Sequence, residues 1–205
     1  MPGHVIAGFY GKLPARGDFV HAGLPRDFID PWDDWLQSVI AGSQSLMGEA
    51  WLPAFLEAPV WRFILPRGMC GSQAVLGLML PSVDRAGRYY PLTFAALSEH
   101  GVAETSGEGW LNACEDAGRA ALEQDTPPQV VADLVVSPEL PEVPSSIAEA
   151  TWWSEGSVRV TPSSLVLRCM PDAATYATML GAETECTDVA SDASRHGEGT
   201  WESPS

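Results

Sequence analysis

The chain has 205 residues, of which 45% are hydrophobic and eight are tryptophan. A chain of this length and apolar content can bury a core without disulfides or metals, which excludes a wholly disordered protein. Its formal net charge of -16 argues against nucleic acid as a partner, because binding to phosphates needs an excess of Lys and Arg. We expect one domain over residues 1–181 and a disordered acidic tail over residues 182–205.

The sequence also argues against a membrane protein and against a metal centre. No apolar run approaches the roughly 18 residues that a transmembrane helix needs, and the N-terminus lacks the pattern of a signal peptide. The four cysteines are scattered, without the spacing of a zinc site. We therefore expect a cytoplasmic protein with reduced thiols, no membrane insertion and no bound cofactor.

The first half of the chain predicts a strand, a long helix and a meander. Residues 4–10 have the pattern of a strand, and residues 16–23 that of a loop. Apolar residues then recur at helical spacing from Pro25 to Met47, although Pro31 suits the start of a second helical segment. Three apolar runs predict consecutive antiparallel strands, the second of them central, over residues 60–66, 73–81 and 89–97.

The second half alternates helices and short strands. Its apolar spacing predicts helices over residues 108–125 and 127–135 and from Pro171, and strands near residues 150–153 and 164–168. Residues 137–149 are rich in proline and acid, which indicates a surface loop. This interleaving favours a mixed sheet with helices on its faces, in an α/β or α+β sandwich.

The sequence shows no recognised catalytic motif and no clear metal-binding pattern. The sequence has no P-loop, no dinucleotide-binding glycine pattern and no GxSxG nucleophile motif. Asp30, Asp33 and Asp34 could ligate a metal, but carboxylates near a helix start are better explained by the helix dipole. We expect no catalytic, cofactor-binding or metal-binding residues. An alternative hypothesis is a small hydrolase or phosphate-binding enzyme that uses Asp18, His21 and Asp84.

Two charged, glycine-containing turns stand out. One is GKLPARGDF at residues 11–19, and the other is PSVDRAGRYYPL at residues 81–92. In the second, Asp84 could satisfy the turn internally by accepting hydrogen bonds from its arginines and backbone. Alternatively, Arg85 and Arg88 face outward and bind an anionic partner. The sequence alone does not choose between these interpretations.

The order of the motifs GFYGKLPARGDF, WDDWL, PSVDRAGRYYPLT and WW resembles the TagF/ImpM family over roughly residues 5–180. Members of this family are accessory proteins of bacterial type VI secretion systems. The resemblance implies a three-layer αβα sandwich with a mixed, largely antiparallel central sheet. It also implies a cytoplasmic, post-translational repressor without enzymatic activity, which binds an FHA-domain scaffold protein of the apparatus.

The turns supply candidate partner-binding residues if they lie at the same edge of the sheet. They would then pool the charges of both turns and offer an aromatic anchor for the partner. The rival hypothesis is that Asp18 and Asp84 neutralise the arginines and lock the turns together, with the partner binding elsewhere; an adaptor without a regulatory role also stays open. The candidates are Lys12, Arg16, Asp18, Phe19, Asp84, Arg85, Arg88 and Tyr89.

Overall fold

The computed structural model describes residues 5–14, 16–98, 107–124, 126–136, 141 and 147–182. Of the predicted acidic tail, all but Ala182 lies outside the described residues, as does most of the predicted surface loop at residues 137–149. The described strands are β1 (Val5–Gly11), β2 (Val20–Ala22), β3 (Trp61–Leu65), β4 (Ala74–Leu80), β5 (Leu92–Ser98), β6 (Ala150–Ser154) and β7 (Ser163–Leu167). The helices are α1 (Arg26–Met47), η1 (Gly48–Ala50), α2 (Trp51–Leu56), α3 (Glu108–Glu123), α4 (Pro128–Val136) and α5 (Ala173–Met179).

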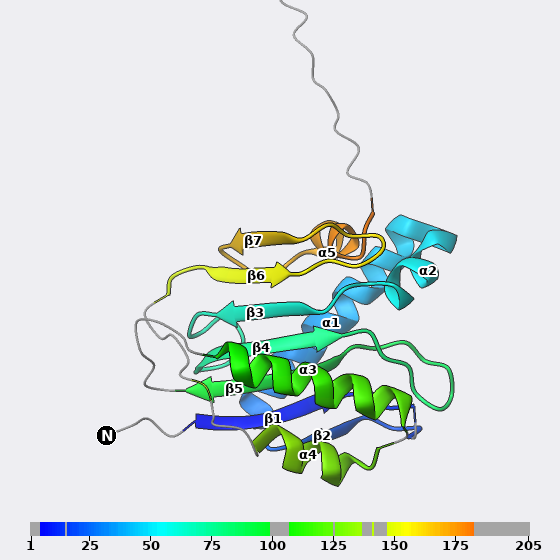
Figure 1. Ribbon diagram of the computed structural model, residues 1–205. Coiled ribbons are helices and arrows are strands. Elements are labelled where there is room, and N and C mark those ends of the chain that lie inside the picture. Colours follow the sequence, from blue (N-terminus) through cyan, green and yellow to red (C-terminus); the bar gives the residue numbers. More distant parts are fainter. Residues whose placement is uncertain are drawn as a thin grey trace, which may run out of the picture.

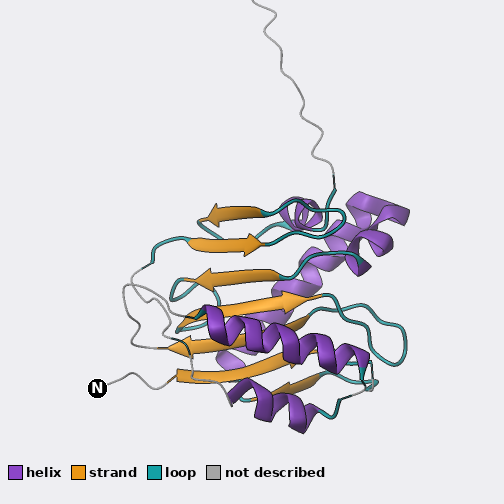
Figure 2. Ribbon diagram, in the orientation of Figure 1, coloured by secondary structure: helices purple, strands orange, loops and turns teal. Residues whose placement is uncertain are grey.

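The strands form one sheet in the order β2-β1-β5-β4-β3-β6-β7, and each pairing among the described strands is antiparallel. Strands β3, β4 and β5 are the predicted meander, and the apolar strand β4 is its central member, as predicted. Helices cover both faces of the sheet (Figures 1 and 2). The predicted three-layer αβα sandwich is therefore confirmed, with a sheet that is antiparallel throughout the described strands.

Two hydrophobic cores, one on each face of the sheet, separate the layers. Helices α1, α2 and α5 pack on one face, and helices α3 and α4 on the other. Side chains alternate between the cores along β1, where Tyr10 joins the first core and Phe9 the second, as the period of two requires. Trp152 is fully buried and its neighbour Trp153 is half-buried, as the sequence predicts for adjacent strand residues.

Two local predictions differ from the structure. Pro31 does not start a new segment, because α1 is one continuous helix that contains it. The missing proline N–H removes only the bond to the carbonyl of Asp27, and burial of Trp32 and Leu36 against the sheet holds the helix together. The predicted loop at residues 16–23 contains the short strand β2, which pairs with the end of β1.

A buried cation joins α3 to the sheet. The Arg62 side chain on β3 donates from Nη2 to Asn112 Oδ1 at 2.7 Å and to Glu115 Oε2 at 3.1 Å. Burial alone would raise the pKa of Glu115, but hydrogen bonds from Arg119 and Arg62 outweigh it and lower that pKa. Arg62 therefore helps to hold α3 against the sheet.

Among the described helices, none has the length and apolar character of a bilayer span.

Candidate functional site: two joined charged turns

The first turn (residues 12–19) and the second turn (residues 82–90) meet because of how β1 pairs with β5. The two strands are antiparallel, with Tyr10 opposite Thr93, so the chain leaves β1 and enters β5 at the same edge of the sheet. Gly11 lies against this junction with a φ of 146°, and a Cβ there would lie 2.3 Å from the carbonyl oxygen of Pro91. Only glycine fits so close to the neighbouring backbone.

Hydrogen bonds join the two turns directly. The backbone N–H of Arg85 donates to the carbonyl oxygen of Arg16 at 2.9 Å. The Ser82 hydroxyl donates to the carbonyl oxygen of Lys12 at 2.6 Å. Because each bond connects one turn to the other, the two segments form a single structural unit, as the shared-edge hypothesis requires.

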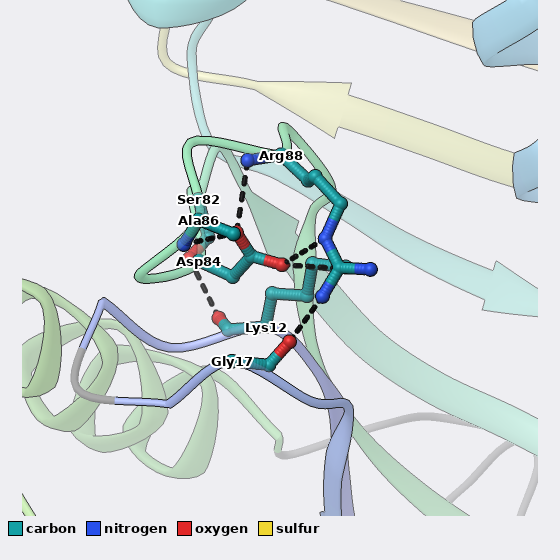
Figure 3. A network of polar contacts seen from close by, with 6 residues as sticks. All are labelled: Lys12, Gly17, Ser82, Asp84, Ala86 and Arg88. Carbon is teal, nitrogen blue, oxygen red and sulfur yellow. Dashed lines mark hydrogen bonds and ion pairs between the residues drawn. The ribbon is translucent and has the colours of Figure 1, made fainter.

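Asp84 lies at the centre of this unit (Figure 3). Its Oδ2 accepts from Lys12 Nζ at 2.5 Å and from Arg88 Nε at 2.7 Å. Its Oδ1 accepts from the backbone N–H groups of Ala86 at 2.8 Å and Arg88 at 2.9 Å. Arg88 also donates from its guanidinium to the carbonyl oxygen of Gly17, which ties the second turn to the first again.

The pair at the centre of the network is buried. Lys12 is 4% exposed and Asp84 is 3% exposed. Burial by itself would raise the pKa of Asp84, but the hydrogen bonds from Lys12, Arg88 and Ala86 together hold that pKa well below its ordinary value. The carboxylate is therefore charged in the folded protein and its acceptor positions are used internally.

An aromatic cluster covers the buried ammonium group. The Phe19 ring lies 4.6 Å from Lys12 Nζ, stacks on Tyr10 at a centroid distance of 5.4 Å and meets Tyr90 edge-on at 4.8 Å. The quadrupole of such a ring attracts a cation placed over its face. Phe19 itself is 42% exposed, so the ring packs in the cluster and is also accessible to solvent.

The same cluster is attached to α1 through Asp33. The hydroxyls of Tyr10 and Tyr90 donate to Asp33 Oδ1 at 2.7 Å and 2.6 Å. Burial and, after it, the hydrogen bond to Asp33 raise the pKa of both phenols, so both stay protonated and keep donating. The sequence suggests a helix start or a metal ligand at Asp33, and nothing in its pattern links this residue to the two tyrosines.

The predicted partner-binding residues divide into an inner and an outer set. Lys12 and Asp84 are enclosed and pair with each other. Asp84 also pairs with Arg88, as the internal-pairing hypothesis expects, whereas its pairing with Lys12 is not part of that hypothesis. Tyr89 is half-buried, with ring contacts to the α2 residues Trp51 and Phe55. The outer set, called here the docking surface, consists of Arg16, Asp18, Phe19, Arg85 and Arg88, all exposed.

The residues of the alternative enzyme hypothesis do not share one environment. Asp18 and His21 are exposed, whereas Asp84 is enclosed and fully hydrogen-bonded, so a substrate would have no access to its carboxylate. In the described part of the chain, no group of three or more His, Cys, Asp or Glu side chains is placed to hold a metal ion. Asp33, one of the carboxylates considered as a ligand, is engaged by the two tyrosines and by Gln37.

Fold and site together define an αβα sandwich domain whose two charged turns are joined by a buried ion network. The family model of the TagF N-terminal domain, type VI secretion system-associated, matches residues 8–136, which include both turns. The chain therefore belongs to the TagF N-terminal domain family.

A solved structure extends the similarity beyond that match. The chain is similar to PA0076 from Pseudomonas aeruginosa PAO1, with 33% sequence identity and a TM-score of 0.79 between the structures. The match covers 87% of this chain and 96% of the other, so it reaches past α4 into the C-terminal strands. No curated protein matches the chain.

Proposed function

We propose that this type VI secretion-associated protein is a cytoplasmic, post-translational repressor of secretion. It acts by binding the FHA-domain scaffold protein of the apparatus and not by catalysing a reaction. Membership of the TagF family supports the link to the secretion system. The enclosure of Asp84 supports a binding role over a catalytic one, because the charged turns use that carboxylate for their own structure.

The observation that carries the proposal is the hydrogen bond between Arg85 and Arg16. It places the two residues side by side at the surface, where both side chains are exposed and form no ion pair with another described residue. Two exposed arginines joined through their backbones suit an anionic patch on a protein, because each guanidinium group presents several donors in a fixed plane. The exposed Phe19 of the first turn supplies an apolar anchor of the kind that contributes most of the affinity in protein interfaces.

Binding of the purified chain to the FHA-domain scaffold of the same bacterium tests the proposal. The informative variant is Arg16→Gln/Arg85→Gln, because both side chains are outside the ion network and their loss leaves the turns intact. We expect its affinity to fall about tenfold, with a steep dependence on salt in the wild type. Arg168→Gln is the matched control, because Arg168 is an exposed arginine beyond the end of β7.

Two outcomes would contradict separate parts of the proposal. If the wild-type chain fails to bind the scaffold at low salt, the partner is wrong. If the double variant binds like the wild type, the docking surface is wrong. Repression is tested separately by following secretion of a marker effector in a deletion strain that carries each variant. The double variant should leave secretion as high as in the deletion strain, whereas Arg168→Gln should repress it as the wild type does.

A further inference from the structure

We propose that the acidic C-terminal segment, residues 183–205, binds the docking surface of its own chain and competes there with the protein partner. This inference rests on the proposed function of that surface, and it adds a regulator to it. Three observations carry it: the charge of the surface, the charge of the segment, and the place where the segment leaves the fold.

The docking surface carries an excess of positive charge, although the chain as a whole is acidic. The buried ammonium and carboxylate beneath it neutralise each other, so its net charge depends on the exposed residues. Arg16, Arg85 and Arg88 contribute three cations and Asp18 one anion, while the whole chain carries -16. The Arg88 side chain is 59% exposed even though it pairs with Asp84, so it still faces solvent.

The C-terminal segment has the complementary charge. It contains six carboxylates and one arginine, and its apolar content is low except for Trp201. A segment of this composition binds through charge and leaves few apolar groups to bury. The acids are Glu183, Glu185, Asp188, Asp192, Glu198 and Glu202.

Just before the segment begins, the chain passes near the two ends of the second turn. Leu180, just after α5, lines one small apolar pocket together with Pro81 and Pro91, the two residues that flank the second turn. The last described residues, Gly181 and Ala182, line a second pocket with Arg159 and Val160 of the β6–β7 connection. A flexible linker of about 20 residues has a root-mean-square span of roughly 25 Å, so the length of the segment allows a contact elsewhere on the same domain.

Attachment to the same chain strengthens such a contact. A tethered segment of this length has an effective concentration in the millimolar range, so even a weak charge-based contact is populated. Because the acids would occupy the same arginines that the partner needs, binding of the segment lowers the apparent affinity of the partner. The partner must therefore displace the segment, and a higher concentration of the partner does so.

The contact within the chain is measured without any partner. A nitroxide is attached to Ser203→Cys in a full-length chain that also carries Cys169→Ser and Cys186→Ser, since Cys70 and Cys114 are buried. We expect strong paramagnetic broadening of the backbone amides of Ala86 and Gly87. It should disappear in the Arg16→Gln/Arg85→Gln chain and at about 1 M salt, where the Debye length is roughly 3 Å. Arg168→Gln should leave it unchanged.

Competition is measured with the FHA-domain scaffold. Three acids of the segment are neutralised in the full-length chain by Asp188→Asn, Asp192→Asn and Glu198→Gln. The matched control neutralises three exposed acids of α3 and α4 instead, by Asp116→Asn, Glu123→Gln and Asp133→Asn. We expect the first chain to bind the scaffold about fivefold more tightly than the control chain, which has the same net charge.

The two experiments separate failure of this inference from failure of the proposed function. Broadening that is uniform over the surface, or that persists in the double-arginine variant, overturns the contact. Equal scaffold affinity of the two neutralised chains overturns the competition while the proposed function stands. If no chain binds the scaffold but the broadening is specific, the proposed partner is wrong and the contact within the chain stands.

Discussion

The ammonium nitrogen of Lys12 lies 2.5 Å from Oδ2 of Asp84, inside the protein, although the two residues belong to different turns. The pair joins the turn after β1 to the turn before β5, and it leaves Arg16 and Arg85 free to face solvent on the outside. A pair of charges in the interior thus serves to hold other charges in place at the surface.

Loss of the Asp84 carboxylate should destabilise the protein strongly. Asp84→Ala leaves the Lys12 ammonium buried without its partner, and breaking a buried pair in this way costs about 3–5 kcal/mol. Urea unfolding followed by tryptophan fluorescence measures the free energy of unfolding. Asp18→Ala, at an exposed acid of the same site, should change it by less than about 0.5 kcal/mol. Similar values for the two variants would show that the buried pair does not stabilise the fold.

The stabilisation by Asp84 should depend on pH in one direction. Its pKa is lower in the folded protein than its ordinary value of 3.8, so the unfolded chain takes up this proton at higher pH than the folded chain does. The stabilisation is therefore complete above that value and is lost as the pH falls below it. The stability difference between wild type and Asp84→Asn should be constant from about pH 7 to about pH 5 and narrow toward about pH 3. A stability difference that widens as the pH falls would contradict the claim that the charged form of Asp84 stabilises the fold.

Two arginines that share Glu115 should differ in their contributions to stability. Arg62 is buried and also bonds Asn112, so Arg62→Met removes charge-assisted hydrogen bonds to two residues of α3 and should cost about 2 kcal/mol. The Arg119 side chain is exposed, and Arg119→Met should cost less than about 1 kcal/mol. Thermal unfolding of both variants checks the comparison. Equal losses would mean that the exposed pair of Arg119 and Glu115 stabilises the protein as much as the buried Arg62 does.

Two glycines of the first motif should tolerate alanine very differently. Gly11→Ala combines a positive φ with a Cβ that overlaps the carbonyl of Pro91, so we expect a loss of about 3 kcal/mol. At Gly17 an added Cβ would meet no heavy atom within 4 Å, so Gly17→Ala should change stability by less than about 0.5 kcal/mol. The free energies of unfolding of the two variants give the result directly. A tolerated Gly11→Ala would mean that the junction of the turns is not tightly packed.

Periodicity is sufficient to predict the main strands of the sheet. The continuous apolar run of β4 predicts a strand buried on both faces, and β4 lies at the centre of the order. Strand β2 escapes prediction because three residues, with the exposed His21 in the middle, are too few to show an alternating pattern. Its formation depends on pairing with β1, a contact that local sequence does not contain.

The inside of the candidate site is not predictable from the chain alone. Charged residues in glycine-containing turns are usually exposed, and Lys12 and Asp84 have no local signal that distinguishes them from Arg16 or Arg85. They are buried because they meet each other across 72 positions of sequence. Asp33 illustrates the same limit, since its two tyrosine partners come from a strand and a turn that only the fold brings together.

The antiparallel register of β1 and β5 has a consequence for how this family diversifies. Backbone pairing brings the two turns to the same end of the sheet, and the glycine at position 11 keeps their junction close. Arg16 and Arg85 at the rim contribute to that closeness through their backbone hydrogen bond, and their side chains contribute nothing to it. If Arg16 and Arg85 bind the partner as proposed, exchanging these outward side chains would change the choice of binding protein and leave the scaffold that presents them intact.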